Sequence, residues 1–317
     1  MQYKFSILIP AYKTKYLDEA IRSVINQTTD TWELIIVDDC SPEDVYAIVN
    51  KYGDKRIRYY RNEKNFGAIN VIDNWNKCLD YSTGDYVICM GDDDCLLPCC
   101  LEEYLKLIEK YPTLNVYHGW TEIIDESSAF SYLTFPRPEY ESVYSMIWGR
   151  WNGREQFIGD FAFLAKDLKS RGGFYNLPLA WASDDITAYR AASIHGIANT
   201  QTLVFQYRKS NLTISSALYS EIKLESLKME KKWMTSLLSI VPHNEIDLKY
   251  YRMIQNIFSE RYKESYYSII LKDLEKESFF KYFYWYKQRS LYGVSVKTMI
   301  KLFLKLMITK ANSIISF

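Results

Sequence analysis

Short apolar runs alternate with stretches of helical periodicity along the first third of the chain. Each run has the length of a buried strand, and the segments between the runs carry apolar residues three and four positions apart, as helices on a sheet do. Strands are predicted over residues 5–10, 33–37, 57–61 and 86–90, and helices over 17–25, 43–52, 67–81 and from 101 onward. This alternation predicts an α/β fold with a mostly parallel central sheet and helices on both faces.

Polar clusters follow three of the predicted strands. Pro-Ala-Tyr at 10–12 ends the first strand, Asp-Asp at 38–39 the second, and Asp-Asp-Asp at 92–94 the fourth. Ligands of open α/β sheets bind at the carboxyl ends of the strands. We therefore expect the three clusters, although far apart in sequence, to meet in one crevice.

The acidic triplet Asp92, Asp93 and Asp94 is the strongest candidate for chemistry. Adjacent carboxylates repel one another and resist burial, so they need a cation or solvent. Mg²⁺ and Mn²⁺ prefer oxygen ligands, and Mg²⁺ is commonly held by one or two carboxylates together with substrate phosphates. The triplet thus favours a site for a metal and a nucleotide diphosphate. The alternative is a solvated acidic turn that caps the helix beginning near Pro98.

Glycine-rich phosphate loops are excluded by the sequence. It has no GxxxxGK[ST] segment, no GxGxxG segment after the first strand, and only 12 glycines. Phosphate charge would then be balanced by a metal and by side chains.

Composition narrows the class of protein further. The 317 residues are 48% hydrophobic and 25% charged, as in folded globular proteins, and the 39 basic and 39 acidic residues balance. We expect no nucleic-acid partner.

The six cysteines form no paired CxxC spacings, which favours free thiols in a reducing cytosol. Without a signal-peptide core or an apolar run of ~20 residues, a cytoplasmic location is expected, with the inner face of the cell membrane as an alternative.

Residues 1–217 resemble a family 2 glycosyltransferase of the GT-A fold. The motifs that carry this resemblance, in their order and spacing, are residues 6–12, 23–28, 33–41, 65–67, 84–87, 92–98, 172–174, 183–185 and 207–208. The resemblance implies a Rossmann-like catalytic domain over 1–217, followed by a helical, basic and aromatic extension over 218–317. It also implies a nucleoside-diphosphate sugar as the donor.

The matching motifs imply a set of residues for the nucleotide-sugar. They are Pro10, Ala11, Tyr12, Asp38, Asp39, Asn65, Gly67, Asp92 and Arg208. Tyr12 would place its ring against the base or ribose, Asp39 would accept a hydrogen bond from the base, and Asp38 would fix the turn. Without the resemblance, packing also explains Tyr12, and a turn or helix cap explains the two aspartates.

The family's usual metal motif is Asp-x-Asp-Asp before Leu-x-Pro, and alignment on Pro98 puts Gly91 in place of its first Asp. The resemblance implies Asp93 as the metal ligand, with Asp92 toward the ribose or behind the metal and Asp94 beside both. Because Gly91 departs from the pattern, the alignment leaves open whether Asp92 or Asp94 assists Asp93. The implied cofactor is a divalent metal, Mn²⁺ or Mg²⁺.

Two other departures concern the diphosphate. Residues 74–76 are Asn-Trp-Asn where many relatives carry Ala-Arg-Asn, and Ser210 stands where relatives often carry His. A basic side chain toward the diphosphate would then come from Lys64 or Arg208, with an ordinary surface role as the alternative for Lys64.

The catalytic base is implied by the motif at 183–185. Counting back six residues from Arg190, as the family spacing does, selects Asp184, with Asp185 as the alternate. An acceptor hydroxyl must lose its proton as it attacks the anomeric carbon, and a carboxylate can accept it. Glycines at 172–173 resemble the family's flexible turn, open to an acceptor. As an isolated pair at a helix start, the two aspartates would be explained by capping.

The tail after residue 217 is helical in pattern, aromatic and basic. Lysines at 297, 301 and 305 recur on one helix face, and no Asp or Glu follows Ser278. A basic amphipathic helix of this kind can lie at an anionic membrane surface. The competing hypothesis is a helix docked on the catalytic domain or at a homodimer contact.

These expectations describe an inverting, metal-dependent transferase that moves a sugar to a hydroxyl acceptor. The resemblance implies a saccharide acceptor, often lipid-linked, in surface polysaccharide synthesis. One rival is a sugar-phosphate nucleotidyltransferase, which carries a glycine-rich basic loop after its first strand, whereas residues 10–15 contain no glycine. The other is a catalytically idle nucleotide-sugar-binding or scaffold subunit, suggested by Gly91 and Ser210.

Overall fold

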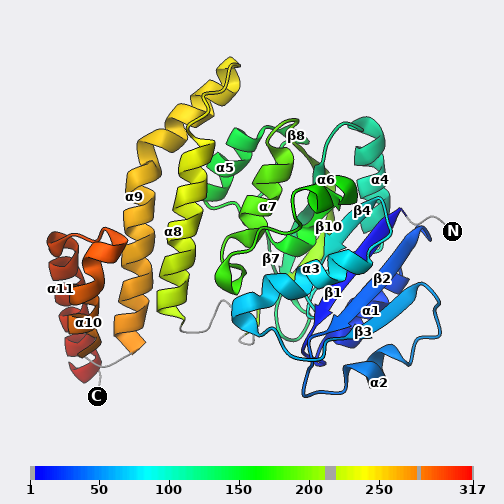
Figure 1. Ribbon diagram of the computed structural model, residues 1–317, viewed down its shortest axis with the longest axis horizontal. Coiled ribbons are helices and arrows are strands. Elements are labelled where there is room, and N and C mark those ends of the chain that lie inside the picture. The colour runs from blue at the N-terminus through cyan, green and yellow to red at the C-terminus, as the bar shows by residue number, and fades with distance from the viewer. Residues whose placement is uncertain (1–3, 211–218, 277–279, 316–317) are drawn as a thin grey trace. The chain divides into compact units, whose positions relative to one another are not determined.

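The computed structural model of the chain describes residues 4–210, 219–276 and 280–315. The chain forms two compact units, Met1–Ile214 and Ser215–Phe317 (Figure 1). The boundary predicted between residues 217 and 218 lies in the segment 211–218, outside the described residues. Within the described ranges the second unit contains helices only.

The first half of the N-terminal unit alternates strands and helices as the periodicity predicted. The bounds of strand β3 match the prediction, β1 and β4 differ from it by one residue at one end, β2 is longer by one residue at each end, and helix α2 is shorter than expected. The elements are β1 (Phe5–Ala11), α1 (Leu17–Ile25), β2 (Trp32–Asp38), α2 (Val45–Val49), β3 (Ile57–Arg61), η1 (Ala68–Asn70), α3 (Val71–Tyr81), β4 (Tyr86–Cys89), β5 (Cys95–Leu96) and α4 (Cys100–Lys110).

The second half of this unit has shorter strands and more turns. Its elements are β6 (Val116–Ile124), β7 (Phe130–Leu133), β8 (Tyr140–Glu141), α5 (Val143–Trp151), η2 (Ile158–Asp160), β9 (Phe161–Leu164), α6 (Ala165–Ser170), η3 (Pro178–Ala180), α7 (Ser183–Ala192) and β10 (Ile197–Arg208).

One mixed sheet runs through the unit in the order β3-β2-β1-β4-β9-β6-β10-β5, with β7 on β6 and β8 on β10. The strands β3, β2, β1 and β4 are parallel, as predicted. Strand β9 then pairs antiparallel with both β4 and β6, although β6 and β10 are again parallel. The predicted α/β class with a helix-flanked central sheet is confirmed, and the parallel pairing is interrupted at β9.

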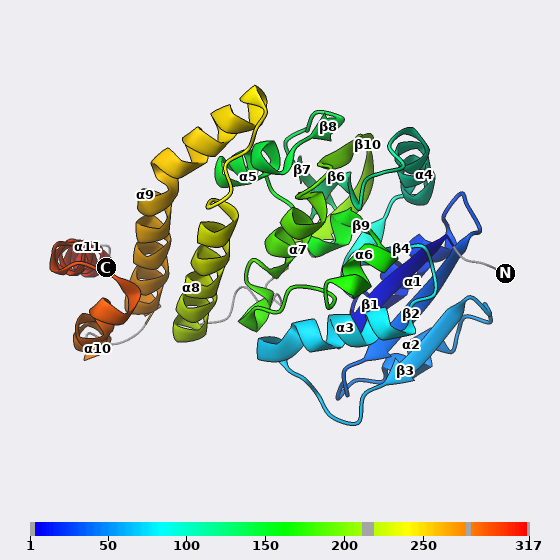
Figure 2. The same cartoon turned by 45° about the horizontal axis from the view of Figure 1, so that its top comes forward.

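Strand β1 lies in the parallel half of the sheet and is buried on both faces. Its residues Phe5, Ile7 and Ile9 share one apolar core with α1, α2 and α4. Helix α3 covers the opposite face, where it packs against β1 and β2 (Figures 1 and 2). Because helices cover both faces, the carboxyl ends of the strands remain as the place where polar residues can serve a ligand.

The C-terminal unit is built of helices, as its sequence pattern predicted. They are α8 (Ser220–Leu237), α9 (Glu245–Lys276), α10 (Phe280–Gln288), η5 (Arg289–Tyr292) and α11 (Val296–Ile315). Asp273 of α9 is buried and accepts hydrogen bonds from Nε1 of Trp285 and Oγ of Ser220, both at 2.7 Å. One carboxylate therefore joins α8, α9 and α10. Among the described residues, every helix is too short or too polar to cross a membrane.

Candidate active site

The polar ends of β1, β2 and β4 meet, as predicted. Asp92, beyond β4, accepts hydrogen bonds from the backbone N–H groups of Tyr12 and Lys13, both at 2.7 Å. Ser41, beyond β2, donates its hydroxyl to the carbonyl oxygen of Tyr12 at 2.6 Å. These contacts join the three polar clusters at the edge of the sheet where α/β proteins bind their ligands.

Asp92 holds the turn that follows β1. Its carboxylate is buried, and burial together with the charge of Asp93 raises the pKa of Asp92 to about 6. The side chain of Ala11 is buried in the core, whereas that of Tyr12 is 41% exposed. Of the three residues at 10–12, Tyr12 is therefore the one that presents a side chain to a ligand.

Asp93 and Asp94 border a small cradle above Gly91. A Cβ atom on Gly91 would lie 2.7 Å from Oδ1 of Asp93 and 2.9 Å from Oδ2 of Asp94. Burial raises the pKa of Asp93, and burial with the charge of Asp93 raises that of Asp94. Two crowded carboxylates whose ionised forms are disfavoured suit a hard divalent cation, and the absence of a side chain at Gly91 lets both carboxylates pack against that residue.

The cradle would supply only part of a metal's coordination sphere. Over the described ranges, no three His, Cys, Asp or Glu side chains gather closely enough to hold a metal ion. Mg²⁺ typically completes its coordination with waters and substrate phosphates, so two carboxylates are consistent with such a site.

The acidic pair after β2 holds the neighbouring loops. Asp38 is completely buried and accepts a hydrogen bond from the backbone N–H of Ser41 at 2.7 Å, which fixes the turn. Asp39 accepts from Nδ2 of Asn62 at 2.9 Å and from the backbone N–H of Gly67 at 3.4 Å. Gly67 has a φ of +74°, a conformation that favours glycine. A nucleotide base would reach Asp39 only by replacing one of these donors.

Arg208 lies beneath the acidic turn. Its side chain is completely buried, with Nε donating to the carbonyl oxygen of Asp93 and Nη2 to Glu19, both at 2.8 Å. The guanidinium also lies 4.0 Å from the ring centre of Tyr16. The resemblance implied Arg208 as a nucleotide-sugar ligand, but in this structure its donors hold the turn that carries the triplet.

A different basic residue accompanies the acidic triplet. The charge of Lys13 lowers the pKa of both Asp92 and Asp93. Lys64 and Asn65 are exposed on the loop after β3. Lys13 and Arg208 are thus both basic side chains whose charges act on the candidate metal site.

The two glycines of the turn at 172–173 have different surroundings. A Cβ atom on Gly173 would lie 2.2 Å from Oδ1 of Asn76, and this oxygen accepts a hydrogen bond from the backbone N–H of Phe174 at 2.9 Å. Gly173 has a φ of +85°. A Cβ atom on Gly172 would have nothing within 4 Å. Asn76 of α3 therefore fills the space beside Gly173, and the space beside Gly172 is open.

Asp184 stands at the start of α7, after a strained turn. Leu179, Ala180 and Ala182 have φ values of 62°, 52° and 63°, which non-glycine residues adopt at an energetic cost and which cluster at functional sites. Burial raises the pKa of Asp184 to about 7, and the charge of Asp185 adds to the rise. A carboxyl group that ionises near neutral pH is suited to accept a proton.

Asp185 is held by the protein rather than presented to a ligand. Its carboxylate accepts hydrogen bonds from Nε of Arg150 at 2.9 and 3.2 Å and from Nε2 of Gln156 at 2.7 Å. Gln156 in turn accepts from Nη2 of Arg137 at 2.9 Å. The charge of Arg150 lowers the pKa of Asp184, against the effect of burial. Asp184 therefore remains the candidate base, and Asp185 positions it.

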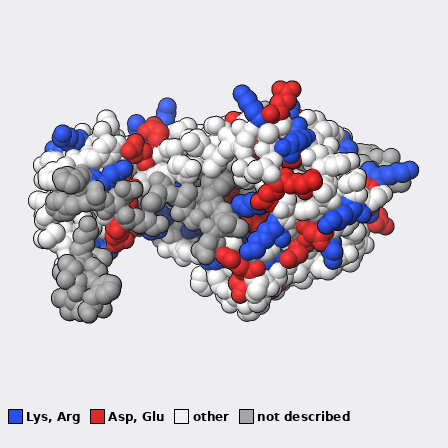
Figure 3. All heavy atoms as spheres, turned by 90° about the horizontal axis from the view of Figure 1, so that it is seen from below, with Lys and Arg blue, Asp and Glu red and all other residues white. Residues whose placement is uncertain are grey.

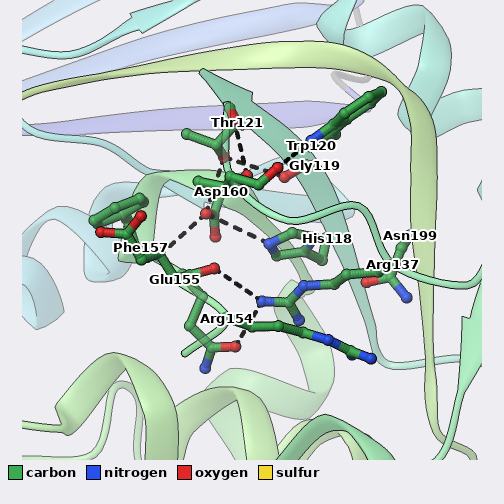
Figure 4. Close-up of polar contacts among 12 residues, drawn as sticks. His118, Gly119, Trp120, Thr121, Arg137, Arg154, Glu155, Phe157, Asp160 and Asn199 are labelled. Carbon is green, nitrogen blue, oxygen red and sulfur yellow. Dashed lines mark hydrogen bonds and ion pairs between the residues drawn. The ribbon is translucent and has the colours of Figure 1, made fainter. Parts of the chain in front are cut away.

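A buried polar cluster lies on β6 and η2 (Figure 4). Asp160 accepts hydrogen bonds from Oγ1 of Thr121 at 3.0 Å and from the backbone N–H of Phe157 at 3.1 Å, and lies 3.4 Å from Nε2 of His118. Burial lowers the pKa of His118. The imidazole of His118 is buried and meets the ring of Phe161 edge-on, with 5.2 Å between ring centres.

Tyr207 links the candidate metal site to the candidate base. Burial raises the pKa of its hydroxyl, and the charges of Asp94, Asp93 and Asp184 raise it further. Its ring stacks on Phe157 with 3.7 Å between ring centres. The charges of Asp93, Asp94 and Asp184 therefore all reach the Tyr207 hydroxyl.

Acidic and basic side chains are interspersed on the face of the chain seen from below in Figure 3. Proteins that bind nucleic acid typically gather Lys and Arg on one face. The side chains drawn on this face do not follow that pattern.

Comparison with known proteins assigns the family. The sequence model described as Glycosyl transferase family 2 matches residues 6–167, half of the chain. The chain belongs to glycosyl transferase family 2. The family 2 chain is 36% identical over 134 residues to an uncharacterized glycosyltransferase of Haemophilus influenzae, a match that covers 41% of this chain and 43% of that protein.

A second relative has a more specific name. Over 136 residues the chain is 29% identical to UDP-Glc:alpha-D-GlcNAc-diphosphoundecaprenol beta-1,3-glucosyltransferase WfgD of Escherichia coli, covering 43% of this chain and 52% of that protein. The chain thus spans about half the length of the relatives it matches.

A solved structure shares the fold over nearly the whole chain. S. aureus TarS 1–349 in complex with UDP-GlcNAc superimposes with a TM-score of 0.63 at 16% identity, covering 98% of this chain and 92% of that chain. This likeness concerns the fold. It confirms that this family 2 glycosyltransferase has the GT-A architecture followed by C-terminal helices.

Several residues of the site could not be assigned a role from the sequence. Lys13 directly follows the Pro-Ala-Tyr motif at 10–12, and this position is the signal in the sequence that could have identified it. Tyr207 belongs to the matching motif at 207–208, in which only Arg208 was given a role. Arg150 and Gln156 lie in no motif, and only folding brings them to Asp185.

Proposed function

We propose that this family 2 glycosyltransferase moves a sugar from a nucleoside-diphosphate sugar to a hydroxyl acceptor, with inversion at the anomeric carbon. The observation that supports this best is Tyr207, whose hydroxyl is subject to the charges of Asp93 and Asp94 and of Asp184. A donor diphosphate beside the first two carboxylates and an acceptor hydroxyl beside the third would bring the reacting atoms together.

The donor would lie against the edge formed by β1, β2 and β4. Tyr12 offers its exposed ring to the base or ribose, while Asp38 and Asp92 keep the surrounding turns in place. A divalent metal, Mn²⁺ or Mg²⁺, would be held by Asp93 with Asp92 or Asp94 and would neutralise the charge that develops on the leaving diphosphate. Asp92 accepts both of its backbone hydrogen bonds on one oxygen, whereas Asp94 accepts one on each oxygen, so either carboxylate could assist Asp93.

Asp184 would act as the general base. Its carboxylate takes the proton of the acceptor hydroxyl while the acceptor oxygen forms a bond to the anomeric carbon. The bond from that carbon to the diphosphate oxygen breaks, and its electron pair leaves with the nucleoside diphosphate. Attack from the side opposite to the leaving group inverts the configuration. Asp185, held by Arg150 and Gln156, fixes the start of α7 so that Asp184 keeps its place.

We further propose a saccharide acceptor carried on a lipid, with the reaction on the cytoplasmic side of the membrane. The name of WfgD, which specifies a diphosphoundecaprenol-linked sugar, supports this proposal. Surface polysaccharide synthesis is the process in which such an acceptor would be extended.

Transfer is tested with UDP-, GDP- and CDP-sugars, Mn²⁺ and a panel of saccharide acceptors. We expect release of nucleoside diphosphate from one donor class, a product of inverted configuration by NMR, and a loss on the order of 10²–10⁴-fold in Asp184→Asn without loss of nucleotide binding. Asp30→Asn is the control, because the Asp30 side chain is 96% exposed.

Two outcomes would overturn the proposal in favour of a rival. Release of pyrophosphate from a nucleoside triphosphate and a sugar phosphate would identify a nucleotidyltransferase. Nucleotide binding by the wild type, with no transfer to any acceptor and no donor hydrolysis, would support the idle subunit.

A further inference from the structure

The last helix of the C-terminal unit carries apolar side chains on two sides. One set, which is buried, packs toward α9 and consists of Met299, Leu302 and Leu306. The other set is exposed and consists of Ile300 at 53%, Leu304 at 56%, Met307 at 48% and Ile308 at 61%. Residues three and four apart share one side of a helix, so the exposed set forms a continuous apolar stripe. Packing within the unit leaves this stripe in solvent.

Lysines border the exposed stripe. Lys297 and Lys301 are one helical turn apart, and both are exposed. Lys301 lies beside the stripe, and Lys297, about one turn before Ile300, lies in line with it at its N-terminal end. The ammonium group of Lys301 lies 5.3 Å from the ring centre of Tyr267 on α9, which keeps it at the side of α11. The segment 281–308 contains no Asp or Glu. The apolar stripe is therefore accompanied by positive charge, with no acidic side chain in its own segment.

We propose that this side of α11 is the surface by which the chain lies on an anionic lipid bilayer. Helices with an apolar side and a lysine-rich border lie in the plane of the membrane interface, with the apolar side chains at the boundary between headgroups and acyl chains. Ile300 and Leu304 would enter that boundary. Lys297 and Lys301 would remain at the level of the lipid phosphates, which is where basic residues gain from anionic lipid.

A second copy of the chain is a poorer partner for this surface. In a two-fold contact the same surface of both copies meets itself. The contact would then gather Lys297 and Lys301 of both copies, and the segment 281–308 has no carboxylate to pair with them. Like charges brought together at an interface oppose association, whereas anionic lipid compensates them.

The inference goes beyond the transfer reaction, and its test requires neither donor nor acceptor. The full chain is sedimented with vesicles of phosphatidylcholine containing about one-third phosphatidylglycerol, and with vesicles of phosphatidylcholine alone. We expect binding to the anionic vesicles that weakens as salt is added, and much weaker binding to the neutral ones. Because each lysine near an anionic surface changes partitioning roughly fivefold, Lys297→Gln with Lys301→Gln should weaken binding about 30-fold.

A second variant tests the apolar stripe, and a third is the matched control. Ile300→Gln with Leu304→Gln should also lose binding, because its exposed apolar surface is gone. Lys249→Gln with Lys263→Gln removes the same charge from exposed positions of α9 and should bind as the wild type does. Circular dichroism and thermal unfolding show whether each variant is folded.

Three results would overturn the proposal. The wild type would fail to sediment with anionic vesicles, or the α11 and α9 lysine variants would lose binding equally. In the third result, the wild type does not bind vesicles and light scattering shows a dimer. If Ile300→Gln with Leu304→Gln dissociates that dimer, the surface is the contact with a second copy of the chain. None of these results would affect sugar transfer, which is measured separately.

Discussion

Replacing Arg150 by Met should shift the pH dependence of catalysis, because Arg150 acts on the proposed base from outside the site of chemistry. Its Nε lies 2.9 and 3.2 Å from the carboxylate oxygens of Asp185. Its charge lowers the pKa of Asp184, which burial and Asp185 raise to about 7. Without that charge, the pKa of Asp184 rises further.

The size of the effect follows from the charge that is removed. An opposite charge within ~4–6 Å lowers a carboxyl pKa by about 1–3 units, and we take about one unit because Asp185 neutralises part of the Arg150 charge. With a pKa of about 7, half of Asp184 is ionised at pH 7. In Arg150→Met about one-tenth would be ionised at that pH, since a pKa one unit above the pH leaves roughly that fraction deprotonated.

The rate should fall because Asp184 can accept a proton only when it is deprotonated. For Arg150→Met, kcat/KM should fall about fivefold at pH 7 and about tenfold at pH 6, and should approach the wild-type value above about pH 9. Asp185→Asn removes the charge that raises the pKa of Asp184. Its acid limb should therefore move to lower pH, opposite to that of Arg150→Met.

The assay is release of nucleoside diphosphate from the donor class identified by binding, measured between about pH 5 and pH 10. NMR titration of the Asp184 carboxyl carbon gives the same pKa without turnover. Arg150→Lys, which keeps the charge, should stay close to the wild-type profile. The reasoning would be refuted if the pH profiles of Arg150→Met and Asp185→Asn were both lowered equally at every pH, or if both shifted in the same direction. Arg150 and Asp185 would then have a structural role only.

Three further predictions concern the metal cradle, the turn beneath it and the nucleotide. Gly91→Ala should weaken Mn²⁺ affinity, measured by calorimetry, about tenfold or more, because its Cβ would lie 2.7 Å from the carboxylate of Asp93 and 2.9 Å from that of Asp94. Gly53→Ala is the control and should have no effect, because its Cβ would have nothing within 4 Å. Arg208→Met should lower the free energy of unfolding in urea by about 2–4 kcal/mol, because it removes the hydrogen bonds and the ion pair that the buried guanidinium makes with Asp93 and Glu19. Lys209→Met, at a side chain 53% exposed, should change it by less than about 0.5 kcal/mol. Tyr12→Ala should weaken nucleotide binding roughly tenfold by loss of stacking, and Tyr12→Phe should not; equal loss in both variants would contradict stacking.

The parallel half of the sheet could be predicted from the sequence because three of its four strands, β1, β2 and β4, are buried on both faces. Such strands appear as continuous apolar runs, as at 33–37, and the polar residues after them mark the strand ends. The meeting of Asp92 with Tyr12 followed from that topology alone. The antiparallel strand β9 and the two-residue strands β5 and β8 give no comparable signal, because their pairing depends on contacts distant in sequence.

The direction of individual side chains was harder to predict than their place in the chain. The motif at 207–208 locates Arg208 at the end of β10, but not that its guanidinium lies beneath Asp93. Likewise, the glycines at 172–173 predict a tight turn, but not that Asn76 fills the space beside it. Asp184 was selected by spacing to Arg190, whereas Arg150, one of the groups that set its pKa, comes from an element without a motif.

The central claim is that Asp93 helps bind a metal through which a nucleoside diphosphate is held. The most direct measurement is calorimetric titration of UDP, GDP and CDP, each with and without Mn²⁺, into the wild type, Asp93→Ala and the exposed control Asp30→Ala. We expect Mn²⁺-dependent binding of one nucleotide, which is lost in Asp93→Ala and kept in Asp30→Ala. Folded wild type that binds none of the three with Mn²⁺, or Asp93→Ala that binds as the wild type does, would contradict it.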